Sequence, residues 1–140
     1  MSVLDVVQGL CFALKLVKQT IKDKGENDIL TKELLITVES VNSIVDGLRE
    51  AGLLTKNQLL HAQNMYETTG EVQKEVLYYL TECSSFYRAL NEASFKTKFD
   101  SLRNKMDSRL AQLTASLAAG NSAKLTKVLD HAEGQATESR

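Results

Sequence analysis

The sequence predicts an all-α protein, an antiparallel four-helix bundle with an additional short C-terminal helix packed across it. Apolar residues recur every three or four positions through most of the 140-residue chain, as they do in amphipathic helices. Proline is absent, so no pyrrolidine ring interrupts a helix. The apolar-periodic segments are joined by short glycine-containing or polar stretches, and short connections favour antiparallel neighbours.

The first two predicted helices have recognisable ends. Ser2 and Asp5 fit a capping box that opens a helix running to about residue 24, and Gly25 tolerates the left-handed conformation that ends helices. The second helix starts near Asn27 or Asp28 and ends before Gly52. The apolar stripes of the two helices are Val3, Val6, Val7, Leu10, Leu14, Val17 and Ile21, then Leu30, Leu34, Val38, Val41, Ile44, Val45 and Leu48.

A second capping box, Thr55 to Gln58, opens the third predicted helix, in which we expect a kink or break near Gly70. A short helix over about 84–90 should point Phe86, Tyr87 and Leu90 inward. The next helix runs from Glu92 or Phe95 to residue 119, where Gly120 stops it. Its stripe is the most regular in the chain and comprises Phe95, Phe99, Leu102, Met106, Leu110, Leu113 and Leu117.

The expected organisation is a four-helix bundle over residues 1–119, a C-terminal brace helix over 120–133 and a polar, mobile tail over 134–140. A chain of this length can bury a core without a metal or a disulfide. Cys11 and Cys83 both lie in apolar helical patterns, which predicts buried, reduced thiols in a cytoplasmic protein. The N-terminal apolar run lacks a basic n-region and is interrupted by Asp5, Gln8 and Lys15, which argues against a signal peptide or a transmembrane helix.

The sequence offers no pattern typical of an active site. HExxH, CxxC, GxSxG and glycine-rich phosphate loops are absent, and neither His61 nor His131 stands in the Glu-x-x-His motif of di-iron bundles. We therefore expect no catalytic residue, no cofactor and no metal. A formal net charge of −1 also argues against a general nucleic-acid binder.

The charges are unevenly distributed along the chain. Residues 1–25 carry four lysines against two aspartates, and residues 83–119 carry six Lys or Arg against three acids, whereas the two segments between them are acidic. The basic helices either attract their acidic neighbours in the bundle or meet anionic lipid. For lipid contact the candidates are Lys15, Lys18, Lys22 and Lys24.

Two faces outside the core stripes predict further contacts. Phe12 and Leu16 lie on the polar side of the first helix, where the C-terminal helix, a partner protein or a bilayer interface would cover them. Small side chains form a ridge opposite the stripe of the last bundle helix, and apolar residues of the C-terminal helix are expected to cover it. The ridge comprises Ala111, Ala115 and Ala118, and the covering residues are Leu125, Val128 and Leu129.

Two segments are similar to a known family. Gly70-Glu71-Val72-Gln73-Lys74 resembles a Gly-Glu-aliphatic-polar-Lys segment, and 99–106 (FDSLRNKM) resembles an FKDVNRKL segment, of the N-terminal four-helix-bundle domain of the mixed lineage kinase domain-like protein. More loosely, the chain resembles the HeLo-like cell-death domains of fungi and plants. The likeness extends over about residues 3–119, mostly as apolar spacing. The acidic second helix departs from the animal pattern, so the family's lipid-binding residues are not carried over.

The resemblance implies a cytoplasmic, membrane-permeabilising executioner of necroptosis-like cell death in innate immunity. Such a protein is restrained by its brace, self-associates on activation by an upstream signalling protein, and engages anionic lipid at the membrane periphery. The alternative is a non-enzymatic adaptor that docks a partner helix or protein in immune or cell-death signalling.

Overall fold

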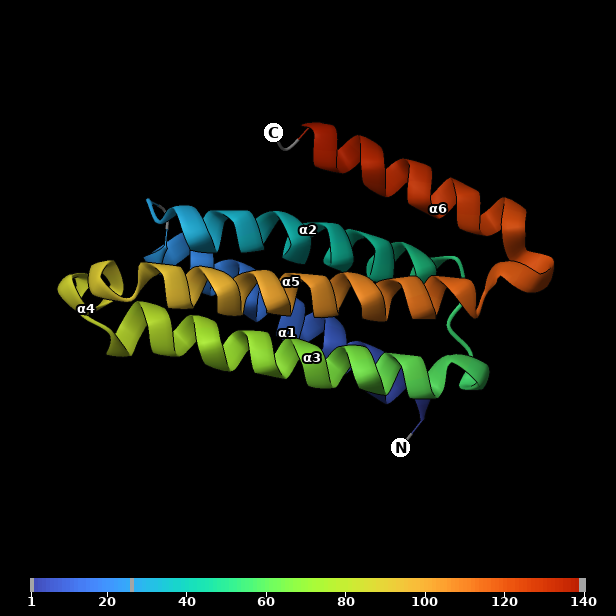
Figure 1. Cartoon of the computed structure of the whole chain (residues 1–140). Helices are drawn as coiled ribbons and strands as arrows, with labels where there is room; N and C mark the ends of the chain where they lie inside the picture. Colours follow the sequence, from blue (N-terminus) through green and yellow to red (C-terminus); the bar gives the residue numbers. More distant parts are fainter. Residues whose placement is uncertain (1, 26, 139–140) are drawn as a thin grey trace.

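The computed structural model describes residues 2–25 and 27–138 and contains no strand in those ranges. The prediction of an all-α helical bundle is confirmed (Figure 1). In chain order the elements are α1 (Val3–Lys24), α2 (Ile29–Glu50), the 3-10 turn η1 (Lys56–Gln58), α3 (Leu59–Leu77), the π-helical turn η2 (Tyr78–Glu82), α4 (Ser85–Leu90), α5 (Glu92–Ala115) and α6 (Ala118–Glu138).

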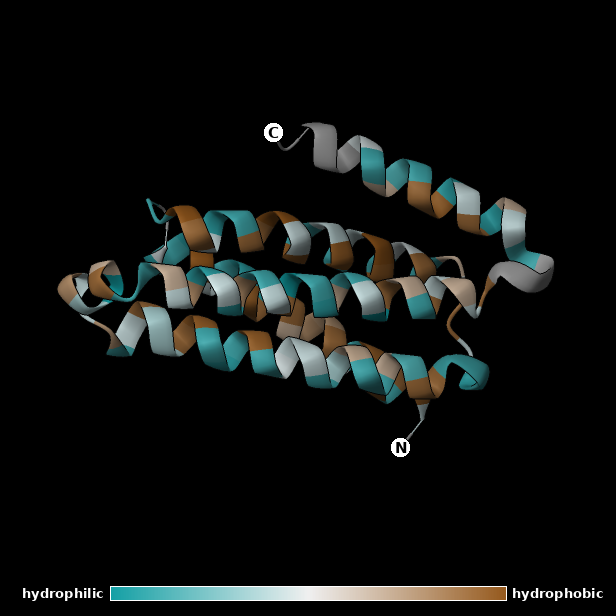
Figure 2. Cartoon of the chain, in the orientation of Figure 1, coloured by the Kyte–Doolittle hydropathy of each residue, from teal (hydrophilic) through white to brown (hydrophobic). Residues whose placement is uncertain are grey.

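The long helices α1, α2, α3 and α5 lie side by side (Figure 1). Helix α1 packs against α2 and α3, α5 packs against the same two helices, and α6 packs mainly on the outside of α2. Hydrophobic positions gather between the helices (Figure 2). The buried core contains nearly all of the predicted stripes, including the fully buried Leu14, Leu34, Met65 and Met106.

Both predicted capping boxes are present. The Ser2 hydroxyl accepts a hydrogen bond from the Asp5 amide. At the start of η1, the side chains of Thr55 and Gln58 each accept a hydrogen bond from the backbone of this turn. Gly52 has the left-handed φ of 69° expected of a residue that ends a helix. Gly25 does not: its φ is −114°, and glycine is needed there because a Cβ would come 2.6 Å from Thr31 Oγ1.

Of the kink or break expected near Gly70, the break does not occur. Gly70 lies within the unbroken α3, where the hydroxyls of Thr68 and Thr69 donate to the carbonyls of Asn64 and Met65. A single helix glycine costs only about 1 kcal/mol, which the surrounding packing offsets. The irregularity comes later, as the π turn η2 at the end of α3.

The predicted boundary at Gly120 is also wrong. Helix α5 ends at Ala115, and the chain turns at Ser116, whose hydroxyl donates to the Leu113 carbonyl while Leu117 enters the core. Helix α6 begins at Ala118 and continues through Gly134 to Glu138, so residues 134–138 of the predicted tail are helical. Residues 139–140 lie outside the described part of the chain.

Candidate functional site

The outer face of α1 carries the exposed apolar pair that the sequence indicated. Phe12 is 67% exposed and Leu16 is 37% exposed, although both belong to a helix whose other face is in the core. Helix α6 lies on α2, so it does not cover this pair, and that alternative was wrong. An exposed phenylalanine on a surface helix face is a feature of contact sites.

The four candidate lysines of α1 fall into two groups. With 100° per residue, Lys15 and Lys22 lie within about 80° of Phe12 around the helix axis, while Lys18 and Lys24 lie about 120° away on opposite sides. Lys15, Lys22 and Lys24 are exposed, and Lys18 is half-buried. Lys15 therefore lies beside the apolar pair, whereas Lys22 lies on the same side of α1 about 15 Å further along the axis than Phe12, and Lys24 is the last residue of the helix.

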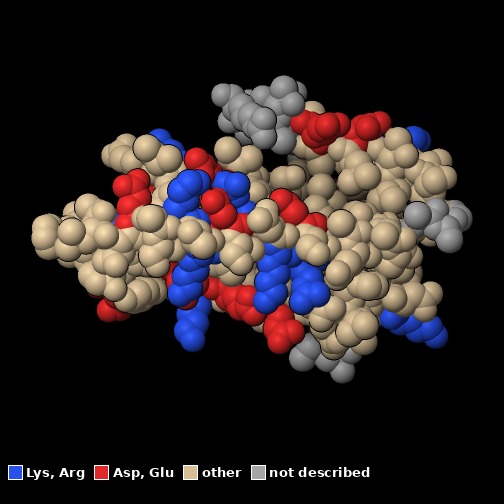
Figure 3. All heavy atoms as spheres, viewed as in Figure 1, with Lys and Arg blue, Asp and Glu red and all other residues tan. Residues whose placement is uncertain are grey.

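The lysines of α1 differ from the basic residues of α5 in their partners. On α5, Lys98 and Lys105 reach Glu75 and Glu71 of α3 at 2.9 Å, and Arg103 reaches Glu33 of α2 at 3.2 Å. Figure 3 shows Lys and Arg side chains gathered over α5, with Asp and Glu side chains beside them. No described residue forms an ion pair with Lys15, Lys18, Lys22 or Lys24. Lys98, Arg103 and Lys105 of α5 thus have acidic partners on neighbouring helices, whereas the lysines of α1 have none among the described residues.

A hollow of about 530 Å³ lies between α1 and α3, one turn from Phe12. Its lining includes Gly9 of α1 and Tyr66 of α3, and a Cβ on Gly9 would come 2.8 Å from Tyr66 Cε2. The acids Asp5 and Glu67 also line it. The hollow therefore combines an aromatic wall with negative charge.

The contacts of α6 differ from those expected. Ala111 and Ala115 on α5 are exposed, so the predicted covering of this ridge was wrong; the side chain of Ala118 lies outside the described part. Leu125, Val128 and Leu129 are half-buried, and Val128 lies over Gly47 of α2. A Cβ on Gly47 would come 2.8 Å from Val128 Cγ1. This mid-helix glycine was the sequence signal for the docking surface, because glycine inside a helix often marks a close approach.

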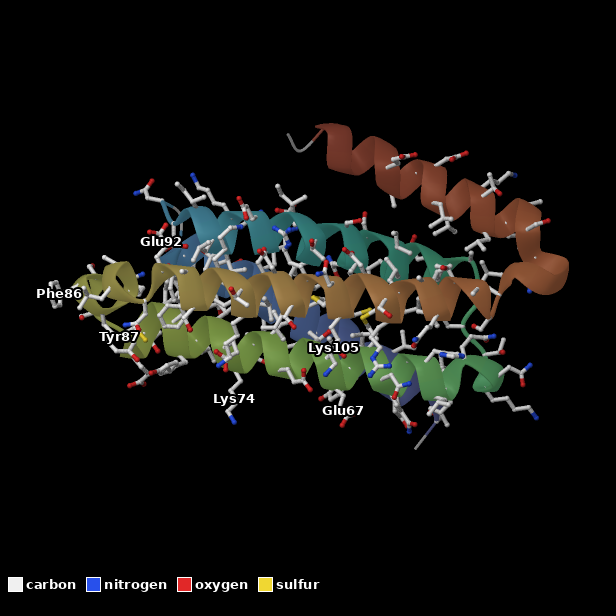
Figure 4. The ribbon with its side chains drawn as sticks, in the orientation of Figure 1. Glu67, Lys74, Phe86, Tyr87, Glu92 and Lys105 are labelled. Atoms are coloured by element: carbon white, nitrogen blue, oxygen red, sulfur yellow. The ribbon has the colours of Figure 1, made fainter. Side chains whose placement is uncertain are left out.

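Helix α4 also contradicts the prediction that its apolar residues point inward. Phe86 is 73% exposed, Leu90 is 68% exposed and Tyr87 is exposed as well. Figure 4 shows Phe86 pointing away from the end of the bundle. The reason is that α4 has only six residues and crosses the end of the bundle, so none of its residues is buried.

A polar network holds α4 against the bundle. Tyr79 Oη donates to Asp28 Oδ2 at 2.6 Å, and Asp28 also caps α2 by accepting the Thr31 amide at 2.9 Å. The Arg88 guanidinium of α4 lies 4.0 Å from the Asp28 carboxylate and 5.2 Å from the centroid of the Tyr79 ring. Burial and then the hydrogen bond to Asp28 raise the pKa of Tyr79 well above its usual value, so its hydroxyl stays a donor.

The same network lines a second hollow of about 610 Å³ at this end of the bundle. Charged side chains from α1 (Asp23 and Lys24), α4 (Arg88) and α5 (Glu92) contribute to its wall, and Ile29 adds an apolar surface. Sequence reasoning missed this hollow because it depends on how α4 folds back across the ends of α1 and α2.

Both cysteines are free and buried, as predicted. Burial, followed by a hydrogen bond to Asp46, raises the pKa of Cys11 to about 11. The thiol therefore remains protonated near neutral pH and belongs to the core of the bundle.

Within residues 2–25 and 27–138, no group of three His, Cys, Asp or Glu side chains is placed to hold a metal ion. Nor is any helix in those ranges long and apolar enough to cross a membrane. Comparison of the chain with protein-family models, with curated proteins and with solved structures gave no match. The resemblance to HeLo-like domains consequently stays a prediction.

Proposed function

We propose that this protein is a cytoplasmic helical bundle that binds anionic membranes through the outer face of α1 and permeabilises them after self-association, as an executioner of cell death. One observation supports the choice of α1. Of the two basic helices, α1 leaves its lysines unpaired, and it presents Phe12 and Leu16 beside Lys15, with Lys22 further along the helix on the side of Phe12 and Lys15.

The expected energies are sufficient for reversible binding. Each lysine near an anionic bilayer contributes about 1 kcal/mol, and burying a phenylalanine side chain contributes up to about 3 kcal/mol. Asp5 and Asp23 on the same helix oppose the lysines, so a single copy binds weakly. Weak binding by one copy fits a protein that acts on membranes only when several copies assemble, because linked sites add avidity.

Helix α6 is the proposed restraint. It lies on the outside of α2 through a small set of half-buried apolar residues, with Val128 over Gly47. A helix held by few apolar contacts opens more readily than the core helices. Its release would expose the apolar outer face of α2 and provide a surface for self-association.

The test compares two exposed apolar positions. Phe12→Glu with Leu16→Glu should abolish binding to vesicles that contain phosphatidylserine and should abolish dye release from them, because the carboxylates remove the inserting side chains. Leu60→Glu changes an exposed residue of α3 and should leave both signals unchanged. Unaltered vesicle binding by the Phe12 and Leu16 variant would refute the assignment.

The hollow between α1 and α3 supports a second candidate function, that of an adaptor. Its aromatic wall and its two acids would suit a basic amphipathic helix of a partner protein. Substituting Tyr66→Ala separates the two functions. Lipid binding should persist in this variant, whereas capture of a partner helix would be lost.

A further inference from the structure

The hollow at the end of the bundle is lined by charges of both signs, and among the described residues only Asp28 and Arg88 of this lining form an ion pair, at 4.0 Å. Asp23, Lys24 and Glu92 line the hollow, yet no ion pair joins any of them to a residue in the described ranges. Elsewhere in the bundle, charges that face each other across helices do pair, as Lys98 does with Glu75 and Lys105 with Glu71. The separated charges around this hollow are complementary to a ligand that carries both an anionic and a cationic group.

The cationic side of the hollow suits a phosphate. The Arg88 guanidinium approaches Asp28 only to 4.0 Å, and its buried Nε has no hydrogen-bond partner. Its Nη2 donates to the Ser85 hydroxyl over a long 3.4 Å. Arginine and lysine are the residues that bind phosphate oxygens, and Lys24 lines the same hollow.

The acidic side suits an ammonium group, and the surroundings suit acyl chains. Among the described residues, Asp23 makes a hydrogen bond only with Gln19, at 2.8 Å. Glu92 stands at the first position of α5 near the start of α2 (Figure 4). Ile29 and Ala89 form apolar parts of the wall, and Ile29 is 73% exposed. Phe86 and Leu90 of α4 are also exposed, although neither lines the hollow.

We infer that the hollow lined by Asp23, Lys24, Arg88 and Glu92 binds the headgroup of a zwitterionic phospholipid, with its acyl chains against Ile29 and α4. Lys24 and Arg88 contact the phosphate, and Asp23 and Glu92 contact the ammonium. This inference rests on the proposed membrane function and adds a second, headgroup-selective contact to it. The acids disfavour a purely anionic lipid here, so the selectivity differs from that of the α1 face.

The test is an NMR titration of the whole chain with dihexanoylphosphatidylethanolamine kept monomeric. Amide signals of residues 27–30 and 85–92 should shift, while those around Phe12 should not. Dihexanoylphosphatidylglycerol, which lacks the ammonium, should bind more weakly. Glycerophosphoethanolamine, which lacks the acyl chains, should also bind more weakly; equal affinity would identify a soluble phosphate ester and overturn the lipid assignment.

Exposed residues provide variants that leave the fold intact. Lys24→Gln and Glu92→Gln should each weaken binding of the phosphatidylethanolamine by up to about fivefold, the range expected for one exposed ion pair. Lys74→Gln and Glu82→Gln are their matched controls, at exposed positions outside the hollow. Ile29→Gln should weaken binding, whereas Leu60→Gln, at a similarly exposed position in α3, should not.

The two proposals fail separately. The headgroup site would be overturned by any of three results, even if vesicles still bind the α1 face. These are the absence of NMR shifts at 27–30 and 85–92, an equal loss of affinity in the control variants, and tighter binding of the phosphatidylglycerol than of the phosphatidylethanolamine. Retained monomer binding with no vesicle binding would instead overturn the proposed function of α1 and leave the headgroup site standing.

Discussion

Substituting Gly47→Ala should weaken the docking of α6 on α2 without destabilising the bundle. The new Cβ would lie 2.8 Å from Val128 Cγ1, closer than side-chain carbons approach, so α6 must move outward. Full burial of a valine contributes about 1.5–3 kcal/mol, and Val128 is half-buried, so about 1 kcal/mol of docking energy is lost. That loss corresponds to about a fivefold increase in the opening of α6. Alanine in place of a mid-helix glycine stabilises α2 by up to about 1 kcal/mol, so global stability should change little.

Hydrogen exchange of the amides of residues 124–132 measures this opening, and dye release from anionic vesicles should rise with it. Gly70→Ala is the matched control, because nothing lies within 4 Å of a Cβ at that position. The control should gain stability and leave α6 exchange unchanged. Adding Val128→Ala to Gly47→Ala should give exchange no faster than Val128→Ala alone, since the two side chains share one space. Unchanged exchange in the Gly47→Ala variant would refute the packing argument.

Three further predictions concern the core and the charges. Met106→Ala should lower the free energy of unfolding, measured by urea titration, by about 2–5 kcal/mol, because Met106 is fully buried. Lys105→Gln, which removes only a surface ion pair, should lower it by less than about 1 kcal/mol. Equal effects of the two substitutions would contradict the view that hydrophobic burial anchors α5. Tyr79→Phe should cost about 1.5 kcal/mol by removing the donor to Asp28, and a Tm equal to that of the unchanged protein would show that this bond contributes nothing. Because folding raises the pKa of Cys11 from 9.0 to about 11, the contribution of the protonated thiol to stability is complete below pH 9 and is lost as pH rises through 11. Cys11→Ala should therefore reduce the fall of Tm at alkaline pH. An unchanged fall of Tm in this variant would contradict the raised pKa.

The long helices could be predicted because each carries a complete local pattern. The stripe from Val6 to Ile21 faces the core in the structure, and the capping boxes at Ser2 and Thr55 open elements where expected. Periodicity and capping depend on residues within one turn, so they can be read from the chain alone. The exposed pair Phe12 and Leu16 was predicted for the same reason.

What the sequence did not predict depends on which helix meets which. The three- and four-residue spacing of Leu125, Val128 and Leu129 shows an apolar face but does not say whether α2 or α5 receives it; only the close approach at Gly47 decides. Likewise, Phe86 and Leu90 fit a helical core pattern, but they are exposed because the six-residue α4 crosses the end of the bundle. Such outcomes follow from tertiary geometry that local spacing leaves open.

The most direct measurement of the central claim is vesicle affinity after matched removal of two positive charges from each basic helix. One variant carries Lys15→Gln and Lys22→Gln on α1, and the other carries Lys98→Gln and Lys105→Gln on α5; circular dichroism confirms that both remain helical. At about 1 kcal/mol per lysine, the α1 variant should bind phosphatidylserine vesicles about 30-fold more weakly, whereas the α5 variant should bind as the unchanged protein does. An equal loss of affinity in the two variants would contradict the claim, because binding would then follow net charge and not the free face of α1.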